Sequence, residues 1–207
     1  MGEDRQSHWE DVYGAKRFTD VSWYQELPAK SLELIAAAGV AEDAPIIDIG
    51  GGASSLVDHL LDRGYRDVTV LDISERALAQ ARARLGEMAD RVHWIVSDIA
   101  AFRPGRLYSA WHDRAVLHFL VEAADRQRYL AALRSGLAPG GCLVLETFGP
   151  QGPLKCSGLD VRRYSLDMMA ELLGPGFELQ ADDIEFHETP SGGRQQFLCT
   201  RWRRLAK

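Results

Sequence analysis

Short apolar runs alternate with helical patterns along the middle of the chain. From residue 45 onward the apolar runs PIIDIG, DVTVLDIS and RVHWIVSDI are separated by segments in which leucine, valine and alanine recur at helical spacing. This alternation is typical of repeated βα units and predicts a mainly parallel sheet. Two more strands are expected through 107–111 and 142–147, on either side of a helix near 126–137. The sequence thus predicts five parallel strands.

The last third of the chain follows a different pattern. A loop that carries glycine and proline, 148–163, precedes a helix over about 165–173 and two strands near 177–187 and 195–202. A short polar connection between two such strands predicts a hairpin. Because a hairpin adds a strand that runs against its neighbour, we expect the final strand to lie antiparallel to the rest of the sheet.

The residues before the sheet form a separate feature. An amphipathic helix is expected over 28–39, and residues 1–27 hold more aromatic side chains than a disordered tail would. Two interpretations stay open: these aromatics fold over a ligand as a lid, or they cap the open edge of the core. The aromatics are Trp9, Tyr13, Trp23 and Tyr24.

Composition excludes several classes of function. Of 207 residues, 46% are hydrophobic and 26% are charged, as in an ordinary globular domain. A formal net charge of −6 disfavours a nonspecific nucleic-acid binder. The charged amino terminus and the absence of an apolar run of 18 residues disfavour secretion and membrane spanning. We expect one cytoplasmic domain over 1–207, a monomer or homodimer with no nucleic-acid or membrane partner.

The three cysteines are widely spaced and match neither a disulfide framework nor a zinc motif, so no metal site is predicted. Cys142 and Cys199 fall in expected strands and should be buried. Cys156 lies in the loop 148–163, which follows the fifth strand and is expected to shape a substrate pocket. There it is either a reactive thiol or an incidental residue.

The sharpest motif is the segment DIGGGASS at 48–55, between an apolar strand and an amphipathic helix. Gly50 and Gly52 let the backbone approach a ligand closely and direct helix-start amides into the crevice at the strand ends. A dinucleotide fingerprint would need Gly or Ala at the position of Ser55. The carboxylate of Asp48 suits a cationic ligand group better than a pyrophosphate.

Acidic residues also end the next two strands. Asp72 comes 22 residues after Gly50, at the position from which a carboxylate reaches ribose hydroxyls in a nucleotide crevice. The alternative is an acidic residue that only favours a helix N-terminus. Asp98 could accept a hydrogen bond from an adenine amine while Ile99 covers the ring, or it belongs to a surface turn. Taken together, these residues predict a nucleoside site.

The segments DIGGGASS, VLDIS and SDI, in this order and spacing, resemble the class I S-adenosylmethionine-dependent methyltransferases over about residues 45–205. The resemblance implies an α/β fold: a Rossmann-like, doubly wound, mainly parallel seven-stranded sheet with an antiparallel last strand and an N-terminal helical lid. S-adenosyl-L-methionine is the implied cofactor, and aromatic rings in the lid would attract its sulfonium cation. The implied cofactor-binding residues are Trp23, Asp48, Gly50, Gly52, Asp72, Ile73, Asp98 and Ile99.

This resemblance divides the single domain into three parts. Residues 1–40 would form the lid, 45–147 the cofactor-binding core, and 148–207 the substrate loop with the closing hairpin. The segments HWEDVYGAK and WHDRA are more loosely similar to the branch that includes thiopurine and small-thiol methyltransferases.

Two candidate catalytic residues, His112 and Arg114, follow the expected fourth strand. His112 is either a general base or a packed, hydrogen-bonded histidine, and His118 is the other candidate base. Asp113 and Arg114 either form a local ion pair or contact the substrate or the cofactor. With a thiol acceptor, a guanidinium at Arg114 would favour the reactive thiolate.

The leading hypothesis is an enzyme that transfers a methyl group from S-adenosylmethionine to a small-molecule nucleophile, with a thiol as one candidate. A protein lysine side chain is an alternative acceptor. Two other classes stay open: a nicotinamide-dependent Rossmann oxidoreductase, which Ser55 and the closing hairpin disfavour, and a noncatalytic nucleoside-binding module.

Overall fold

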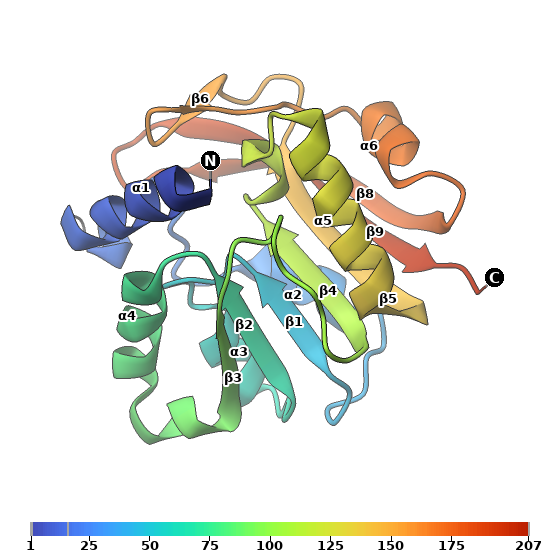
Figure 1. Cartoon of the computed structure of the whole chain (residues 1–207), viewed down its shortest axis with the longest axis horizontal. Helices are drawn as coiled ribbons and strands as arrows, with labels where there is room; N and C mark the ends of the chain where they lie inside the picture. Colours follow the sequence, from blue (N-terminus) through green and yellow to red (C-terminus); the bar gives the residue numbers. More distant parts are fainter. Residues whose placement is uncertain (1, 16, 207) are drawn as a thin grey trace.

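Seven strands make one sheet in the computed structural model, which describes residues 2–15 and 17–206 (Figure 1). Their order is β3-β2-β1-β4-β5-β9-β8. Neighbours among β1 to β5 are parallel, and β9 runs antiparallel to both β5 and β8. The predicted mixed seven-stranded sheet and its antiparallel last strand are confirmed. The strands are β1 (Ile46–Ile49), β2 (Val68–Asp72), β3 (Val92–Val96), β4 (Tyr108–Arg114), β5 (Leu137–Phe148), β8 (Phe177–Glu188) and β9 (Arg194–Arg204).

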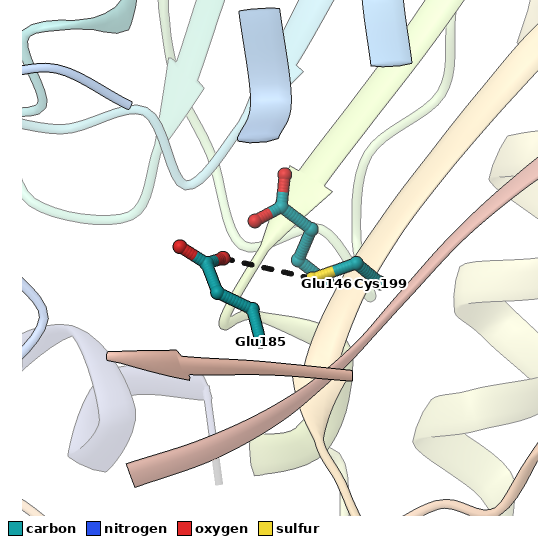
Figure 2. Close-up of side chains that lie close together, drawn as sticks. All are labelled: Glu146, Glu185 and Cys199. Carbon is teal, nitrogen blue, oxygen red and sulfur yellow. Dashed lines mark hydrogen bonds between the residues drawn. The ribbon is translucent and has the colours of Figure 1, made fainter. Parts of the chain in front are cut away.

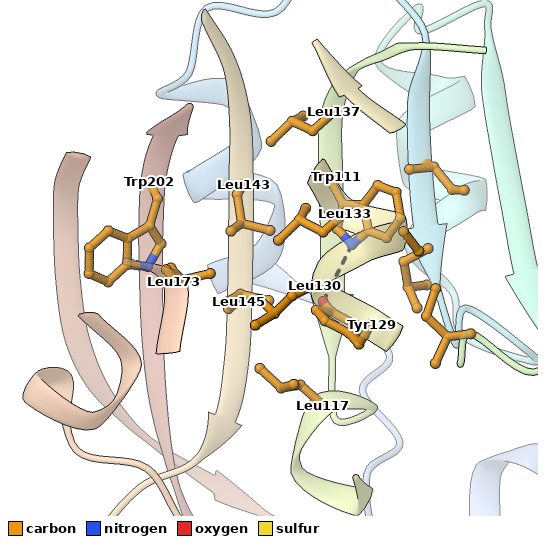
Figure 3. Close-up of a cluster of buried hydrophobic side chains, with 14 of the residues drawn as sticks. Trp111, Leu117, Tyr129, Leu130, Leu133, Leu137, Leu143, Leu145, Leu173 and Trp202 are labelled. Carbon is orange, nitrogen blue, oxygen red and sulfur yellow. Dashed lines mark hydrogen bonds between the residues drawn. The ribbon is translucent and has the colours of Figure 1, made fainter. Parts of the chain in front are cut away.

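Helices cover both faces of this sheet, so it is doubly wound as predicted. Apolar side chains of α2, α3 and α4 pack on one face, and those of α5 and α6 pack on the other. Figure 3 shows the second core, where Leu130 and Leu133 of α5 lie against Leu143 and Leu145 of β5. The helices are α1 (Gly2–Ala15), α2 (Ala29–Ala36), α3 (Leu56–Asp62), α4 (Glu75–Leu85), α5 (Ala123–Gly136) and α6 (Leu166–Leu173).

Serine caps fix where two of these helices begin. The hydroxyl oxygen of Ser74 accepts a hydrogen bond from the amide of Ala77 at 3.2 Å, and that of Ser165 accepts one from Met168 at 3.2 Å. A cap of this kind stabilises a helix by about 1 kcal/mol. In α4 the cap residue Ser74 comes two residues after Asp72 and donates its amide to the Asp72 carboxylate, so the helix start holds the end of β2 in place.

The fourth strand is longer than the sequence predicts. It runs to Arg114 rather than ending at 111, because it pairs with β1 and β5 over its whole carboxyl half. His112 and Arg114 therefore lie within the strand and not after it. His112 is opposite Asp48 of β1, and Arg114 is opposite Glu146 of β5.

The loop predicted after the fifth strand has some structure of its own. It contains a two-stranded hairpin of β6 (Lys155–Cys156) and β7 (Leu159–Asp160). Val161 and Tyr164 return the chain to the body of the protein through backbone hydrogen bonds to Leu154 and Phe148.

The N-terminal region is helical, as expected, and α1 lies beside α4 near the carboxyl ends of the parallel strands (Figure 1). The carboxylate of Glu10 accepts hydrogen bonds from the Ser74 hydroxyl at 3.1 Å and from the amide of Glu75 at 2.7 Å. Because the first amides of a helix lack intrahelical partners, Glu10 is a second cap for α4. This contact sets α1 over the mouth of the strand ends.

Among the described residues, the longest helices are too short and too polar to cross a lipid bilayer.

Candidate functional site

Two adjoining cavities open at the carboxyl ends of the parallel strands. The larger has about 800 Å³ of space, its open mouth included, and reaches from the ends of β2 and β3 to β5 and β9. The smaller has about 530 Å³ and lies along the glycine turn after β1. Tyr13, Trp23, Gly50 and Arg114 line both cavities. A ligand longer than one cavity can therefore extend along both.

The glycine turn shapes the floor of these cavities. Gly50 has φ +66° and Gly52 has φ +39°, a region that side-chain-bearing residues rarely adopt. A Cβ at Gly52 would lie 2.6 Å from Oδ2 of Asp72, and one at Gly51 would lie 2.4 Å from Oδ2 of Asp48. The turn therefore has to be glycine for the carboxylates of β1 and β2 to lie so close to its backbone.

Asp72 is at the end of β2 with its side chain in the larger cavity. Its Oδ1 accepts a hydrogen bond from the amide of Ser74 at 2.8 Å. Burial, together with the nearby carboxylates of Asp48 and Glu10, raises the pKa of Asp72 to about 7. A buried carboxylate with so few donors is suited to ligand hydroxyls. Ile73, the next residue, lines the same cavity.

Asp98 and Ile99 lie after β3 and line the larger cavity together with Ser97. The carboxylate of Asp98 accepts a hydrogen bond from the amide of Ala100 at 2.9 Å and pairs with Arg5 of α1 at 2.8 Å. Ile99 is 4% exposed, so its side chain is an apolar wall. The ion pair to Arg5, which sequence reasoning missed, ties α1 to this part of the site.

A row of four buried charged side chains crosses the sheet beneath the smaller cavity. His112 Nδ1 lies 2.7 Å from Asp48 Oδ1, and His112 Nε2 lies 3.5 Å from Glu146 Oε1. Arg114 Nε lies 3.3 Å from Glu146 Oε2, and the Ser31 hydroxyl donates to Glu146 Oε1. We call Asp48, His112, Glu146 and Arg114 the charged row.

The electrostatics of the charged row fix its protonation. Burial alone would lower the pKa of His112, but the carboxylates of Asp48 and Glu146 raise it to about 10. Burial alone would raise the pKa of Glu146, but His112 and Arg114 hold it below its usual range. His112 is therefore an imidazolium near neutral pH, which favours the packed, hydrogen-bonded interpretation over a free general base.

Asp113 points to the other face of the sheet. Its Oδ1 accepts hydrogen bonds from the amides of Val116 at 2.9 Å and Leu117 at 3.3 Å, and burial raises its pKa to about 6. Adjacent strand residues face opposite sides, so Asp113 and Arg114 cannot form the local ion pair that was one reading of the sequence. Arg114 instead pairs with Glu146 and donates to the carbonyl of Trp23 at 2.9 Å.

Glu146 also belongs to a small cluster with Glu185 and Cys199, whose candidate ligand atoms lie within 4.8 Å of one another (Figure 2). The thiol of Cys199 donates to Glu185 at 3.7 Å. Because Glu146 already faces a serine hydroxyl, an imidazolium and a guanidinium, protein contacts account for its charge. We assign no metal ion to this cluster.

The N-terminal aromatics form one wall of the site. Trp9, Tyr13 and Trp23 line the larger cavity, with ring centroids of Trp9 and Trp23 5.6 Å apart and those of Tyr13 and Trp23 6.2 Å apart. Tyr24 lines the smaller cavity. Tyr13 also packs on Ala53 of the glycine turn. The rings therefore cap the core and also face the cavity.

The far end of the larger cavity is built from segments that come later in the sequence, after β4. His118, Phe119, Phe148 and Phe197 line it, as does Cys156 of β6. Cys156 is buried and lies 3.9 Å from the hydroxyl of Ser22. As predicted, Cys142 and Cys199 are buried in strands.

The structure thus brings nearly all the predicted site residues together. Of those predicted, only Gly52 does not itself line a cavity, and it belongs to the turn that does. Sequence reasoning missed Arg5, Glu146 and Phe197. A signal existed for Glu146 alone, since a single charge stands in the apolar strand CLVLETF.

Comparison with known proteins agrees with this geometry. Residues 46–141 match the family described as "Methyltransferase domain". Nodulation protein S of Rhizobium tropici is 30% identical over 128 residues, 62% of this chain and 51% of that protein. The ubiquinone/menaquinone biosynthesis C-methyltransferase UbiE of Paracoccus denitrificans is 32% identical over 129 residues, 60% of this chain and 50% of that protein. The chain spans about half the length of these two relatives.

A solved structure matches along nearly the whole chain. The 1,6-didemethyltoxoflavin-N1-methyltransferase of Burkholderia thailandensis, with bound 1,6-didemethyltoxoflavin and S-adenosylhomocysteine, has a TM-score of 0.70 at 23% identity, covering 99% of this chain and 87% of that chain. Residues 46–141 thus match a methyltransferase domain, and the chain has the fold of that solved methyltransferase.

Proposed function

We propose that this chain binds S-adenosylmethionine and transfers its methyl group to a small-molecule nucleophile. The observation that carries this proposal is the arrangement of Asp48, Asp72 and Asp98 around the glycine turn, at the ends of three parallel strands and along two adjoining cavities. The methyltransferase-domain match over 46–141 supports it.

The residues present fit this cofactor. Asp72, the buried carboxylate with few donors, would accept hydrogen bonds from the ribose hydroxyls, and Asp48 would face the cationic amino group. Ile73 and Ile99 would cover the adenine, with Asp98 at its edge. The bare backbone of the glycine turn leaves room for a chain between ribose and amino group. When bound, this cofactor supplies an electrophilic methyl group on a sulfonium.

The aromatic wall supports a place for the sulfonium. Trp23 lines both cavities, at the junction where the middle of an extended ligand would lie. An aromatic face attracts a cation within about 6 Å of its centroid by roughly 0.5 to 2 kcal/mol. Trp23 is held there because its carbonyl accepts a hydrogen bond from Arg114. Arg114 is thus a positioning residue for this wall as well as a lining residue.

A small acceptor fits the covered site better than a protein lysine. Side chains of α1 and of the segment 17–28 already occupy the mouth, and methyl transfer by in-line displacement depends mainly on holding the two reactants in line. A thiol is one candidate, because the guanidinium of Arg114 at the cavity would lower a thiol pKa and favour the thiolate.

His112 acts in this proposal by holding a proton, not by removing one. As an imidazolium between Asp48 and Glu146 it orients the Asp48 carboxylate. His112→Ala should therefore lower single-turnover rate far less than the 100-fold or more that loss of a general base costs, as an order-of-magnitude figure. A larger loss with His112→Ala than with Arg114→Ala would instead favour an acceptor that needs a base.

The decisive test of activity is formation of S-adenosylhomocysteine, measured by mass spectrometry with thiol, phenol, amine and protein acceptors in parallel. We expect turnover with at least one small acceptor and none with the protein pool. Turnover with proteins alone would replace the small-molecule assignment by the lysine alternative. Cofactor binding without turnover on any class would leave the noncatalytic nucleoside-binding module as the better description.

A further inference from the structure

The far end of the larger cavity contains polar groups that the cofactor contacts above do not use. This end, lined by Arg114, His118, Phe119, Phe148 and Phe197, is mainly aromatic. This far end is remote from Asp72 and Asp98, and it is the part of the cavity in which a methyl acceptor would lie. The inference that follows rests on the proposed function and concerns the chemical class of that acceptor.

His118 has a fixed tautomer. Its Nδ1 accepts a hydrogen bond from the amide of Phe148 at 3.2 Å, so Nδ1 carries no proton. Burial and the nearby Arg114 lower the pKa of His118 to about 3, which leaves the ring neutral. The single proton of a neutral imidazole is then on Nε2, which is a donor. The ring is also stacked on Phe148, with centroids 4.2 Å apart, and cannot turn freely.

The donor at Nε2 has no hydrogen-bond partner among the described residues, although His118 is fully buried. A buried donor left without an acceptor destabilises a protein, so such atoms in binding cavities point to a missing ligand atom. The fixed tautomer also means that His118 cannot remove a proton from an acceptor through Nε2. It can only donate a hydrogen bond.

Arg114 supplies a second donor of the same kind. Its Nη1 donates to Trp23 and its Nε faces Glu146, while Nη2 is buried and has no hydrogen-bond partner within the described chain. The guanidinium lies over the ring of Phe197, with its central carbon 4.6 Å from the centroid. Phe197 therefore fixes the plane of the guanidinium.

We propose that the acceptor is a planar aromatic molecule with an anionic oxygen or sulfur, which accepts hydrogen bonds from Nε2 of His118 and Nη2 of Arg114 while its ring packs among the aromatic side chains. His118 is then a specificity-determining residue. Two buried donors without a hydrogen-bond partner among the described residues favour an anion over a cation, and ligand anions are stabilised by a nearby guanidinium. A negative acceptor also gains from the positive sulfonium of the cofactor.

The test uses three matched probes of one ring system: 1-naphthoate, neutral 1-naphthamide and cationic 1-naphthylmethylammonium. Each is titrated by calorimetry into the full-length protein saturated with S-adenosylhomocysteine. We expect 1-naphthoate to bind about tenfold or more tightly than either of the other probes, the scale of one hydrogen bond to a charged group. Equal or tighter binding of the cation, or binding of none of the three, would overturn the proposal.

Two substitutions at one position separate the Nε2 donor from the rest of the ring. His118→Asn keeps an acceptor near Nδ1 for the Phe148 amide but removes the donor, so 1-naphthoate affinity should fall about tenfold with naphthamide affinity little changed. His118→Gln places an amide N–H near Nε2 and should recover part of the loss. The matched control is His93→Asn, at an exposed histidine on β3, which should change nothing.

Binding of S-adenosylhomocysteine is measured in the same variants and keeps the two proposals apart. Unchanged cofactor affinity with lost naphthoate preference in His118→Asn is the expected result. Unchanged naphthoate affinity in that variant would overturn the assignment of His118 while the proposed function stands. Failure of the wild-type chain to bind S-adenosylhomocysteine, with the naphthoate preference intact in the unliganded protein, would overturn the proposed function but not the anion site.

Discussion

The two halves of the larger cavity are built in different ways. The half assigned to the cofactor holds Asp72, the last residue of β2, and Asp98, two residues after β3, and each accepts a hydrogen bond from the backbone amide two residues later. The half assigned to the acceptor holds Arg114 and His118, whose contacts come from segments 30 to 91 residues away. One half is local in sequence, and the other depends on the register of β4, β5 and β9.

Because of this difference, we expect residues of one half to serve mainly ligand binding and residues of the other half to serve mainly the stability of the fold. On the cofactor side the carboxylates lie at the strand ends, and the pKa of Asp72 is raised because burial and neighbouring carboxylates oppose its charge. On the acceptor side Arg114 belongs to the charged row, in which each charge has an opposite partner. We therefore expect substitutions on the first side to change affinity, and substitutions in the charged row to change the stability of the fold.

The largest effect is expected for Glu146→Ala. It would leave the imidazolium of His112 and the guanidinium of Arg114 buried without their shared carboxylate, and breaking such a pair costs about 3 to 5 kcal/mol. The free energy of unfolding in urea measures the loss. The control is Glu185→Ala, a half-buried neighbour whose pKa burial raises, for which we expect little change. Equal losses in the two variants would contradict the role of the charged row.

A pH dependence follows from His112. Its folded-state pKa, about 10, lies above the ordinary value of 6.5, so the stability it contributes is fully present below pH 6.5 and is lost as pH rises through 10. The free energy of unfolding of wild type and His112→Gln, measured from pH 6 to 10, should therefore converge as pH rises. A difference between the two that stays constant over this range would show that His112 is not charged in the folded protein.

On the cofactor side, a substitution should change ligand affinity and leave the stability of the fold largely unchanged. Asp72→Asn should weaken S-adenosylhomocysteine binding by about 10- to 100-fold, since hydrogen bonds to a charged group contribute roughly 1.5 to 3 kcal/mol. Thermal unfolding without ligand should be unchanged or shifted upward, because the buried carboxylate is removed. The control is Glu75→Gln, the next acidic residue along the chain, outside both cavities. If Asp72→Asn instead lowered the unfolding temperature and left the affinity for S-adenosylhomocysteine unchanged, Asp72 would contribute to stability rather than to binding.

The smallest effect is expected where α1 meets the cofactor half. Arg5 pairs with Asp98 at 2.8 Å and with Asp125 at 3.2 Å, and its side chain is 24% exposed. Such partly exposed pairs contribute about 1 kcal/mol or less, so Arg5→Gln should weaken S-adenosylhomocysteine binding only a few-fold. Hydrogen exchange of α1 should slow when the ligand binds wild type, and less so in the variant. Exchange that does not respond to ligand in either protein would leave α1 a cap of the core alone.

The sequence predicted one half of the site better than the other for a physical reason. Carboxyl ends of parallel strands meet at one edge of a sheet, so Asp48, Asp72 and Asp98 could be placed together from strand order alone. The contacts of Glu146 with His112 and Arg114 depend on which residues of β4 and β5 are opposite each other, and β4 ends three residues later than predicted. Pairing across the sheet, not local pattern, sets that length.

The position of the aromatic wall likewise could not be predicted from local sequence pattern. Its four residues were apparent from composition, but the docking of α1, which carries Trp9 and Tyr13, depends on Glu10 capping α4, a contact between residues more than 60 positions apart. No local pattern marks Glu10 for that role. Likewise Phe197 joins the cavity only because β9 inserts between β5 and β8.

In the proposed site, Asp72 and Asp98 hold the nucleoside of S-adenosylmethionine and Asp48 faces its amino group. Calorimetric titration of wild type with S-adenosylhomocysteine and, separately, with NAD tests this assignment most directly. We predict one S-adenosylhomocysteine bound per chain, with affinity lost in Asp72→Asn, and no binding of NAD. Binding of NAD in preference to S-adenosylhomocysteine would overturn this assignment and favour the nicotinamide-dependent alternative.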